Sequence, residues 1–332
     1  MNKQTLIQTV ARLMESPKGI LAIDESMSTC GKRFAKLGVP ETEEKRREYR
    51  ELLVTAPEIE KYISGYILFD ETIRQSTKEG KSFTSILQSK GISIGIKVDQ
   101  GLADLPNHPI EKITQGIDGL SKRLQEYKSM GASFAKWRAV YTVGENTPSV
   151  ECMQENAILL TKYATLCQEL DIVPIIEPEV LIDGDYTIEQ SYETNAKNLD
   201  IIFSELRNSN VFISGVILKN SFVFSGKEAG KRVPAEKVAE MTAKCFKAHI
   251  PAHIGGIVFI SGGQPGDEAA INLNAMYQAG PFPWPLSFSY GRGIQNEALQ
   301  AWAKNPTDVA GAQVLLLSTA KNNSLATLGK YK

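Results

Sequence analysis

The chain has 332 residues, of which 42% are hydrophobic and 23% charged, a composition typical of globular rather than disordered proteins. Its formal net charge of -1 gives no basic field for nucleic acid or an anionic membrane, so any phosphate binding must be local. No apolar stretch approaches the ~20 residues that span a bilayer, and the first residues lack the apolar core of a signal peptide. We therefore expect one soluble domain over 1–332, without nucleic-acid or membrane partners.

Cysteine usage indicates the compartment. Cys30, Cys152, Cys167 and Cys245 form no C-x-x-C pair, and a chain of this length needs no disulfide framework. A cytoplasmic location is the simplest expectation.

Eight short apolar runs are spaced along the chain like the strands of a barrel. They are rich in Ile, Val, Leu and Ala rather than cleanly alternating, as expected for strands covered on both faces. The runs are 19–26, 62–70, 92–101, 132–140, 171–180, 211–220, 255–263 and 285–293.

Amphipathic segments separate these runs. Helices are predicted over 112–131, 150–170 and 234–249, and a terminal helix lies within 305–332. Strict alternation of strand and helix predicts parallel strands. The expected fold is an α/β protein of the (β/α)8 TIM barrel type, and a doubly wound open sheet is the structural alternative.

Charged or hydroxylated residues stand at most of the strand ends. In a parallel barrel the C-terminal strand ends converge on one pocket, where such folds keep their active sites. The residues in question are Asp24, Lys97, Lys136, Arg138, Glu177, Glu179, Lys219, Ser261 and Arg292.

Lys219 has the surroundings of an imine-forming lysine. It follows Val216, Ile217 and Leu218, and burial disfavours the ammonium form. Lys136 would project into the same pocket, and its charge would lower the pKa of Lys219 further. The simpler alternative is that Lys219 only forms an ion pair with a nearby carboxylate.

Three acidic residues could move protons. Glu177 and Glu179 lie two apart on one strand and therefore face the same side, as Lys136 and Arg138 do. Two close carboxylates resist ionising together, which favours one of them as a proton carrier. Asp24 could accept a proton from a substrate hydroxyl, although an N-cap or turn role is also open.

The last two runs end in glycine-rich turns, 261–264 and 290–293. Their backbone N–H groups stand beside the Ser261 hydroxyl and the Arg292 guanidinium. Loops after strands seven and eight are a recurrent phosphate site in this barrel class, so a small phosphorylated ligand is expected.

Metal catalysis is poorly supported. The three histidines are His108, His249 and His253, and Pro251 separates the last two. A zinc or iron site needs about three well-placed ligands. Neither a metal nor another cofactor is expected.

Ten motifs, in order along nearly the whole chain, resemble the class I fructose-bisphosphate aldolase family of animals and plants. The resemblance implies metal-independent, reversible cleavage of fructose 1,6-bisphosphate to dihydroxyacetone phosphate and glyceraldehyde 3-phosphate, in glycolysis and gluconeogenesis. It also implies a homotetramer. The motifs are 19-GILAIDES-26, 66-YILFDET-72, 95-GIKVDQG-101, 134-FAKWR-138, 173-VPIIEPE-179, 218-LK-219, 260-ISGGQ-264, 271-INLNA-275, 288-FSYGR-292 and 324-SLATLGKY-331.

The same resemblance implies a role for each site residue. Lys219 would form the imine, Glu177 would serve in dehydration and proton transfer, and Glu179 would support Lys219 from beside it. Asp24 would take the C4 hydroxyl proton, and Lys136 with Arg138 would polarise and position the substrate. The first phosphate would bind to Ser261, Gly262, Ser289 and Arg292, and the second to Ser26, Thr29 and Lys97, with Arg33 nearby.

Two departures from the family pattern stand out. Asn220-Ser221 follow Lys219, where the family usually has Pro-Asn, so the local backbone is expected to be less rigid. The sequence ends at Lys332 without the family's terminal tyrosine, and Tyr331 matches an internal one. We therefore expect slow proton exchange at C3.

Two rival functions fit less well. Another Schiff-base lyase or a transaldolase would not need two phosphate sites. A non-catalytic scaffold would not need Asp24, Lys136, Glu177, Lys219 and Arg292 together, although the fold alone never proves activity.

Overall fold

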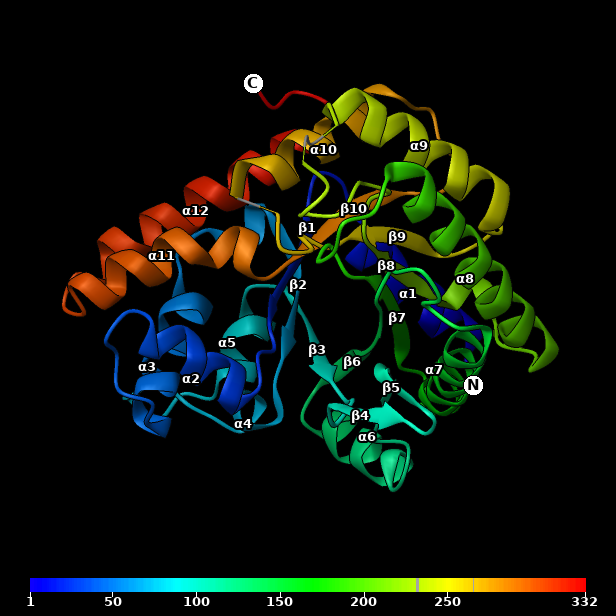
Figure 1. Ribbon diagram of the computed structural model, residues 1–332. Helices are drawn as coiled ribbons and strands as arrows, with labels where there is room; N and C mark the ends of the chain where they lie inside the picture. Colours follow the sequence, from blue (N-terminus) through cyan, green and yellow to red (C-terminus); the bar gives the residue numbers. More distant parts are fainter. Residues whose placement is uncertain (231–232, 265) are drawn as a thin grey trace.

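The computed structural model describes residues 1–230, 233–264 and 266–332. Eight parallel strands form a closed barrel in the order β1-β10-β9-β8-β7-β6-β3-β2 (Figure 1). Strand β1 pairs with both β2 and β10, so the sheet has no open edge. This confirms the predicted (β/α)8 barrel and excludes the doubly wound sheet. The strands are β1 (Gly19–Ile23), β2 (Ile63–Leu68), β3 (Ser93–Lys97), β6 (Ala132–Tyr141), β7 (Val173–Val180), β8 (Ile217–Asn220), β9 (Gly256–Phe259) and β10 (Leu286–Tyr290).

Helices surround the strands on the outside (Figure 1). The predicted helices at 150–170, 234–249 and within 305–332 correspond to α7, α9 and α12. Among the described residues, no helix is long and apolar enough to cross a membrane. The helices are α1 (Lys3–Leu13), α2 (Met27–Ala35), α3 (Glu43–Thr55), α4 (Asp70–Ile73), α5 (Phe83–Ser89), α6 (Leu120–Ser129), α7 (Val150–Glu169), α8 (Ile188–Asn208), α9 (Ala235–His249), α10 (Gly266–Gln278), α11 (Arg292–Lys304) and α12 (Val309–Ala326), with short 3-10 turns at Ile59–Lys61 and Ile213–Gly215.

The helix predicted over 112–131 is too long at its start. Its first residues belong to an antiparallel hairpin of β4 (Leu102–Leu105) and β5 (His108–Thr114), and α6 begins only at Leu120. Gly116 and Gly119 have positive φ angles of 122° and 67°, a left-handed backbone that a right-handed helix does not continue through. These two glycines set the boundary that periodicity alone missed.

The N-terminal half of the barrel is filled and closed. The Phe134 ring lies inside the barrel against β3, where a Cβ atom on Gly95 would come within 2.2 Å of it. On α1, the apolar side chains of Leu6, Val10 and Leu13 pack into the same cluster as Phe134 and other inward-facing strand residues. The interior is therefore solid at this end, and open space remains at the C-terminal strand ends.

Candidate active site

A cavity of about 1060 Å³ lies at the C-terminal ends of the barrel strands. It brings together every site residue that the sequence predicts, although these residues come from seven different strands and the segments that follow them. The predicted residues among those that line it are Asp24, Ser26, Thr29, Arg33, Lys97, Lys136, Arg138, Glu177, Glu179, Lys219, Ser261, Gly262, Ser289 and Arg292.

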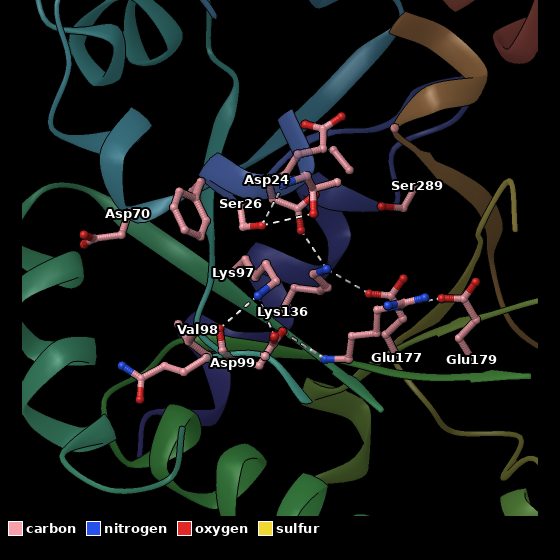
Figure 2. Close-up of a pocket in the computed structure, with 18 of the residues that line it drawn as sticks. Asp24, Ser26, Asp70, Lys97, Val98, Asp99, Lys136, Glu177, Glu179 and Ser289 are labelled. Atoms are coloured by element: carbon pink, nitrogen blue, oxygen red, sulfur yellow. Dashed lines mark hydrogen bonds and ion pairs between the residues drawn. The ribbon is translucent and has the colours of Figure 1, made fainter. Parts of the chain in front are cut away.

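Four charged side chains form a continuous chain of ion pairs in this cavity. Lys136 Nζ lies 2.6 Å from Asp24 Oδ2 and 3.0 Å from Glu177 Oε2. The other oxygen of Glu177, Oε1, lies 3.4 Å from Lys219 Nζ. Figure 2 shows Lys136 between the Asp24 and Glu177 carboxylates. Glu177 therefore contacts both lysines, one with each oxygen.

Lys219 is 4% exposed, and its pKa is lowered. Burial is the largest cause, the Lys136 ammonium adds to it, and the negative charge of Glu177 opposes it. Pairing with Glu177 therefore does not outweigh burial and the repulsion by Lys136, and the neutral amine is more accessible than in an ordinary lysine. The predicted combination of burial and repulsion by Lys136 is confirmed.

The other three members of the chain are charged. Burial disfavours the ammonium form of Lys136, but Asp24 and Glu177 raise its pKa above the usual range. Burial disfavours the Asp24 carboxylate, but Lys136 and Lys219 bring its pKa to about 2. Burial acts on Glu177 in the same way, and the Lys136, Lys219 and Arg138 cations lower its pKa. The cations around Glu177 therefore favour its ionised form in the resting site, the form in which it can accept a proton.

Glu179 has a different partner from the one implied for it. Arg138 Nε lies 2.5 Å from Glu179 Oε2 on the neighbouring strand, where Val140 of β6 is in register with Glu179 of β7. The ion pair of Glu179 is thus with Arg138 and not with Lys219, so any support for Lys219 is indirect. The contact fixes the guanidinium of Arg138 at the cavity wall.

The first predicted phosphate site is built from two loops. Gly262 and Gly263 have φ angles of 53° and 80°, a left-handed turn that exposes backbone N–H groups beside Ser261. Ser289 is 1% exposed, and its Oγ has no hydrogen-bond partner among the described residues. Arg292 begins α11, so a helix N-terminus faces the same place. These groups offer an anion several free donors.

The second predicted phosphate site lies at the start of α2. The Ser26 side chain caps this helix by accepting from Thr29 N at 3.3 Å, and it donates to Thr29 Oγ1 at 3.0 Å. Lys97 Nζ lines the cavity and bonds Asp99 Oδ1 at 2.5 Å. Arg33 also lines it, but its guanidinium binds Glu25, Gln295 and Asn296. Ser26, Thr29 and Lys97 are therefore the more available donors.

Some cavity residues were missed by the sequence reasoning. Asp99, which holds Lys97, stands two positions after it and could have been found by the same spacing rule that paired Glu177 with Glu179. Lys32 and Lys36 of α2 also line the cavity, and their four-residue spacing on one helix face was the available signal. By contrast, none of the three histidines lines it, and His249 bonds Asp200.

Comparison with known proteins agrees with this geometry. Residues 5–332 match the model of the family Fructose-bisphosphate aldolase class-I. The chain is 50% identical to a probable fructose-bisphosphate aldolase class 1 of Xanthomonas campestris pv. campestris over the full length of both chains. It is 46% identical to the chloroplastic fructose-bisphosphate aldolase 3 of Arabidopsis thaliana, over 98% of this chain and 83% of that protein.

A solved structure of fructose-bisphosphate aldolase from Plasmodium falciparum has the same fold. It superimposes with a TM-score of 0.97 at 41% identity, covering 99% of this chain and 95% of the other. The matched region thus extends over the whole barrel and spans the residues of all ten motifs. The chain belongs to the class I fructose-bisphosphate aldolase family.

Proposed function

We propose that the protein catalyses the reversible cleavage of fructose 1,6-bisphosphate through an imine on Lys219, without a metal ion or another cofactor. The observation that carries this is the buried Lys219 amine with a lowered pKa, 3.4 Å from a carboxylate that also contacts the Lys136 ammonium. It combines a nucleophile, a proton carrier and a fixed positive charge at one point.

The first step joins Lys219 to the substrate. The neutral amine attacks the C2 carbonyl of the ketose, and the proton lost from nitrogen moves through Glu177 to the former carbonyl oxygen. That oxygen takes a second proton, drawn from solvent through Glu177, and leaves as water, so that a positively charged iminium remains. Glu177 lies within reach of Lys219 Nζ, and its carboxylate is ionised at the start, the state needed to accept the first proton.

The second step breaks the C3–C4 bond. Asp24, ionised in the resting site, takes the proton of the C4 hydroxyl. The electron pair of the C3–C4 bond moves toward the iminium and forms an enamine, while C4 leaves as the aldehyde of glyceraldehyde 3-phosphate. The Lys136 ammonium, 2.6 Å from Asp24, stabilises the negative charge that develops on the C4 oxygen.

The third step returns the enzyme to its starting state. A proton taken from solvent and added at C3 turns the enamine back into an iminium, and Asp24 gives up to solvent the proton that it took from the C4 hydroxyl. Water then attacks C2, the C2–N bond breaks, and dihydroxyacetone phosphate, one proton and the free Lys219 amine are released. The cations beside the Glu177 carboxylate hold it ionised between proton transfers.

Two phosphate sites favour a bisphosphate over other substrates of Schiff-base enzymes. One site lies at the N-terminus of α11 with Ser261, Gly262 and Ser289, and the other at the N-terminus of α2 with Ser26 and Thr29. Both line the cavity that holds Lys219. A substrate with a phosphate at each end would be fixed with its middle carbons at the ion-pair chain.

We further propose that residues 1–332 act as one domain, that the enzyme forms a homotetramer, and that it works in the cytoplasm. The family resemblance supports the tetramer, and the four free, buried cysteines fit a reducing compartment. Light scattering tests the assembly, and a pure monomer would refute it.

The direct test traps the imine. The protein is incubated with dihydroxyacetone phosphate and sodium borohydride in the presence of a chelator, and the modified peptide is mapped by mass spectrometry. A stable adduct on Lys219, lost in the Lys219→Arg variant, is expected. No adduct, together with no chelator-resistant cleavage of fructose 1,6-bisphosphate, would refute the proposal and favour a non-catalytic scaffold.

A further inference from the structure

The strand that carries Lys219 is only partly held by its backbone. On the side of β7, the register of β8 ends with the pairs Ile175–Ile217 and Ile176–Leu218, one residue before Lys219. On the side of β9 it continues through Lys219 to Asn220. Backbone pairing with β7 therefore ends at the residues just before Glu177 and Lys219, and beyond this point other contacts hold the end of β8.

Side-chain hydrogen bonds hold the end of β8 beyond the point where its pairing with β7 stops. Asn220 Nδ2 donates to Asn195 Oδ1 of α8 at 3.0 Å and to the Ser221 carbonyl at 3.1 Å. Asn195 is itself anchored, since its Nδ2 donates to the Ser191 carbonyl at 2.9 Å. Ser221 Oγ donates to the Val180 carbonyl of β7 at 3.3 Å. The end of β8 is thus tied to α8 and to β7.

The two asparagines are fully enclosed. Asn195 and Asn220 are each 1% exposed. Two buried rings lie near Asn220: Phe222, two residues later in the chain, and Phe259, its register partner on β9, are stacked with their ring centroids 4.1 Å apart. A buried amide pair adds little net stability compared with an apolar pair of similar shape. What it adds is a directional contact, which apolar packing does not supply.

Asn220 also connects the lysine to the first phosphate loop. Its carbonyl accepts a hydrogen bond from Ile260 N at 3.0 Å, one residue before Ser261. A shift at Asn220 would therefore move Lys219 on one side and the Ser261 loop on the other. This places the residue at the junction of two parts of the site.

We propose that the hydrogen bond between Asn195 and Asn220 is a positioning device that fixes Lys219 relative to Glu177. The inference rests on the proposed function, because it assigns the bond a role in imine formation. Neither asparagine touches the substrate. They act on the reaction through the backbone of β8.

The test replaces the amides by an apolar pair. In the double variant Asn195→Leu/Asn220→Leu both polar partners are removed together, so neither is left unpaired and the fold should survive. We expect kcat for fructose 1,6-bisphosphate cleavage to fall about ten-fold with little change in KM, since a displacement of about 1 Å can cost a hundred-fold. The pH midpoint of borohydride trapping at Lys219 should also move, because its distance from Glu177 changes.

A matched control is Asn323→Leu. Asn323 is also 1% exposed and bonds a backbone carbonyl, that of Thr319 at 2.9 Å, but it lies on α12 and does not line the cavity. It should lower thermal stability without changing kcat or the trapping profile. A purely structural role for the asparagine pair would give this same result in the double variant.

The outcomes distinguish the positioning role of the asparagine pair from the proposed catalytic function. A double variant with the kcat and trapping profile of the unmodified enzyme would overturn the positioning role. If the double variant does not fold, Asn195→Ala, which removes the acceptor of this bond and leaves Asn220 in place, is judged by the same two measurements. Absence of a Lys219 adduct in the unmodified protein would instead refute the proposed function itself.

Discussion

Replacing Lys136 by methionine removes one positive charge and keeps the length of the side chain. In the intact protein this ammonium lies 2.6 Å from Asp24 and 3.0 Å from Glu177, in a site where Lys136 and Glu177 are buried and the Asp24 side chain is 12% exposed. The variant would leave two carboxylates in the cavity without their shared partner. Its unfolding therefore reports on the ion-pair chain directly.

The expected loss of stability is large at neutral pH. Removing one partner of a buried ion pair costs about 3–5 kcal/mol, because the remaining charge is left uncompensated. Lys237→Met is a suitable control, since Lys237 pairs with Glu240 at 3.0 Å on the exposed surface of α9. An exposed pair of this kind contributes about 0–1 kcal/mol.

The sign of the pH dependence should also reverse. In the intact protein the folded pKa of Asp24 is about 2, below its ordinary value of 3.8, so its contribution is present above pH 3.8 and is lost as pH falls toward 2. This contribution is about 2 kcal/mol. Without Lys136, burial dominates and raises the folded pKa of both carboxylates. Lowering the pH from 7.5 toward 4.5 should then stabilise the variant relative to the intact protein.

Urea unfolding followed by tryptophan fluorescence measures both effects, with protein concentration held fixed because assembly also shifts the midpoint. Trp137 and Trp302 are buried and report on the core. The difference in unfolding free energy between the two proteins should shrink between pH 7.5 and 4.5. A difference that stays constant over this range would refute the electrostatic account of Lys136.

Three further outcomes are expected. Lys97→Met should raise KM for fructose 1,6-bisphosphate about ten-fold or more, because a charged hydrogen bond is worth about 1.5–3 kcal/mol. The KM for fructose 1-phosphate should not change, and equal effects on both substrates would show that Lys97 does not belong to the second phosphate site. Glu177→Gln should slow single-turnover imine formation about 10²–10⁴-fold, and unimpaired trapping of Lys219 would contradict its role as proton carrier. Gly95→Ala should destabilise the barrel by about 1–3 kcal/mol, since its Cβ would meet the Phe134 ring at 2.2 Å; an unchanged calorimetric midpoint would show that Phe134 moves freely.

The fold and the residues that make up the site could be predicted from the sequence for a physical reason. Parallel strands that end at one rim must bring their end residues together, so placing Asp24, Lys136, Glu177 and Lys219 at strand ends was enough to predict one cavity. The alternation of apolar runs with amphipathic segments likewise predicted the closed barrel.

Pairings within the site were harder to predict. The spacing rule placed Glu177 and Glu179 on the same face, but it did not show that Glu177 meets three cations while Glu179 pairs with Arg138. Which cation each carboxylate meets depends on distances of 2.5–3.4 Å between groups on different strands. Such distances depend on strand register, which the sequence pattern does not contain.

The charges of the cavity favour the intermediate over the resting state. In the proposed mechanism Lys219 reacts as the neutral amine, and the chain then holds the Lys136 cation and the two anions Asp24 and Glu177, so one negative charge is left over within it. Forming the iminium on Lys219 supplies the missing positive charge beside Glu177, and no group needs to move to receive it. Stabilisation by charges already in place is the largest contribution in many enzymes. The two lowered pKa values therefore support the same proposed step. A lower pKa of Lys219 favours the reactive amine, and a lower pKa of Glu177 favours the carboxylate that pairs with the iminium formed from it.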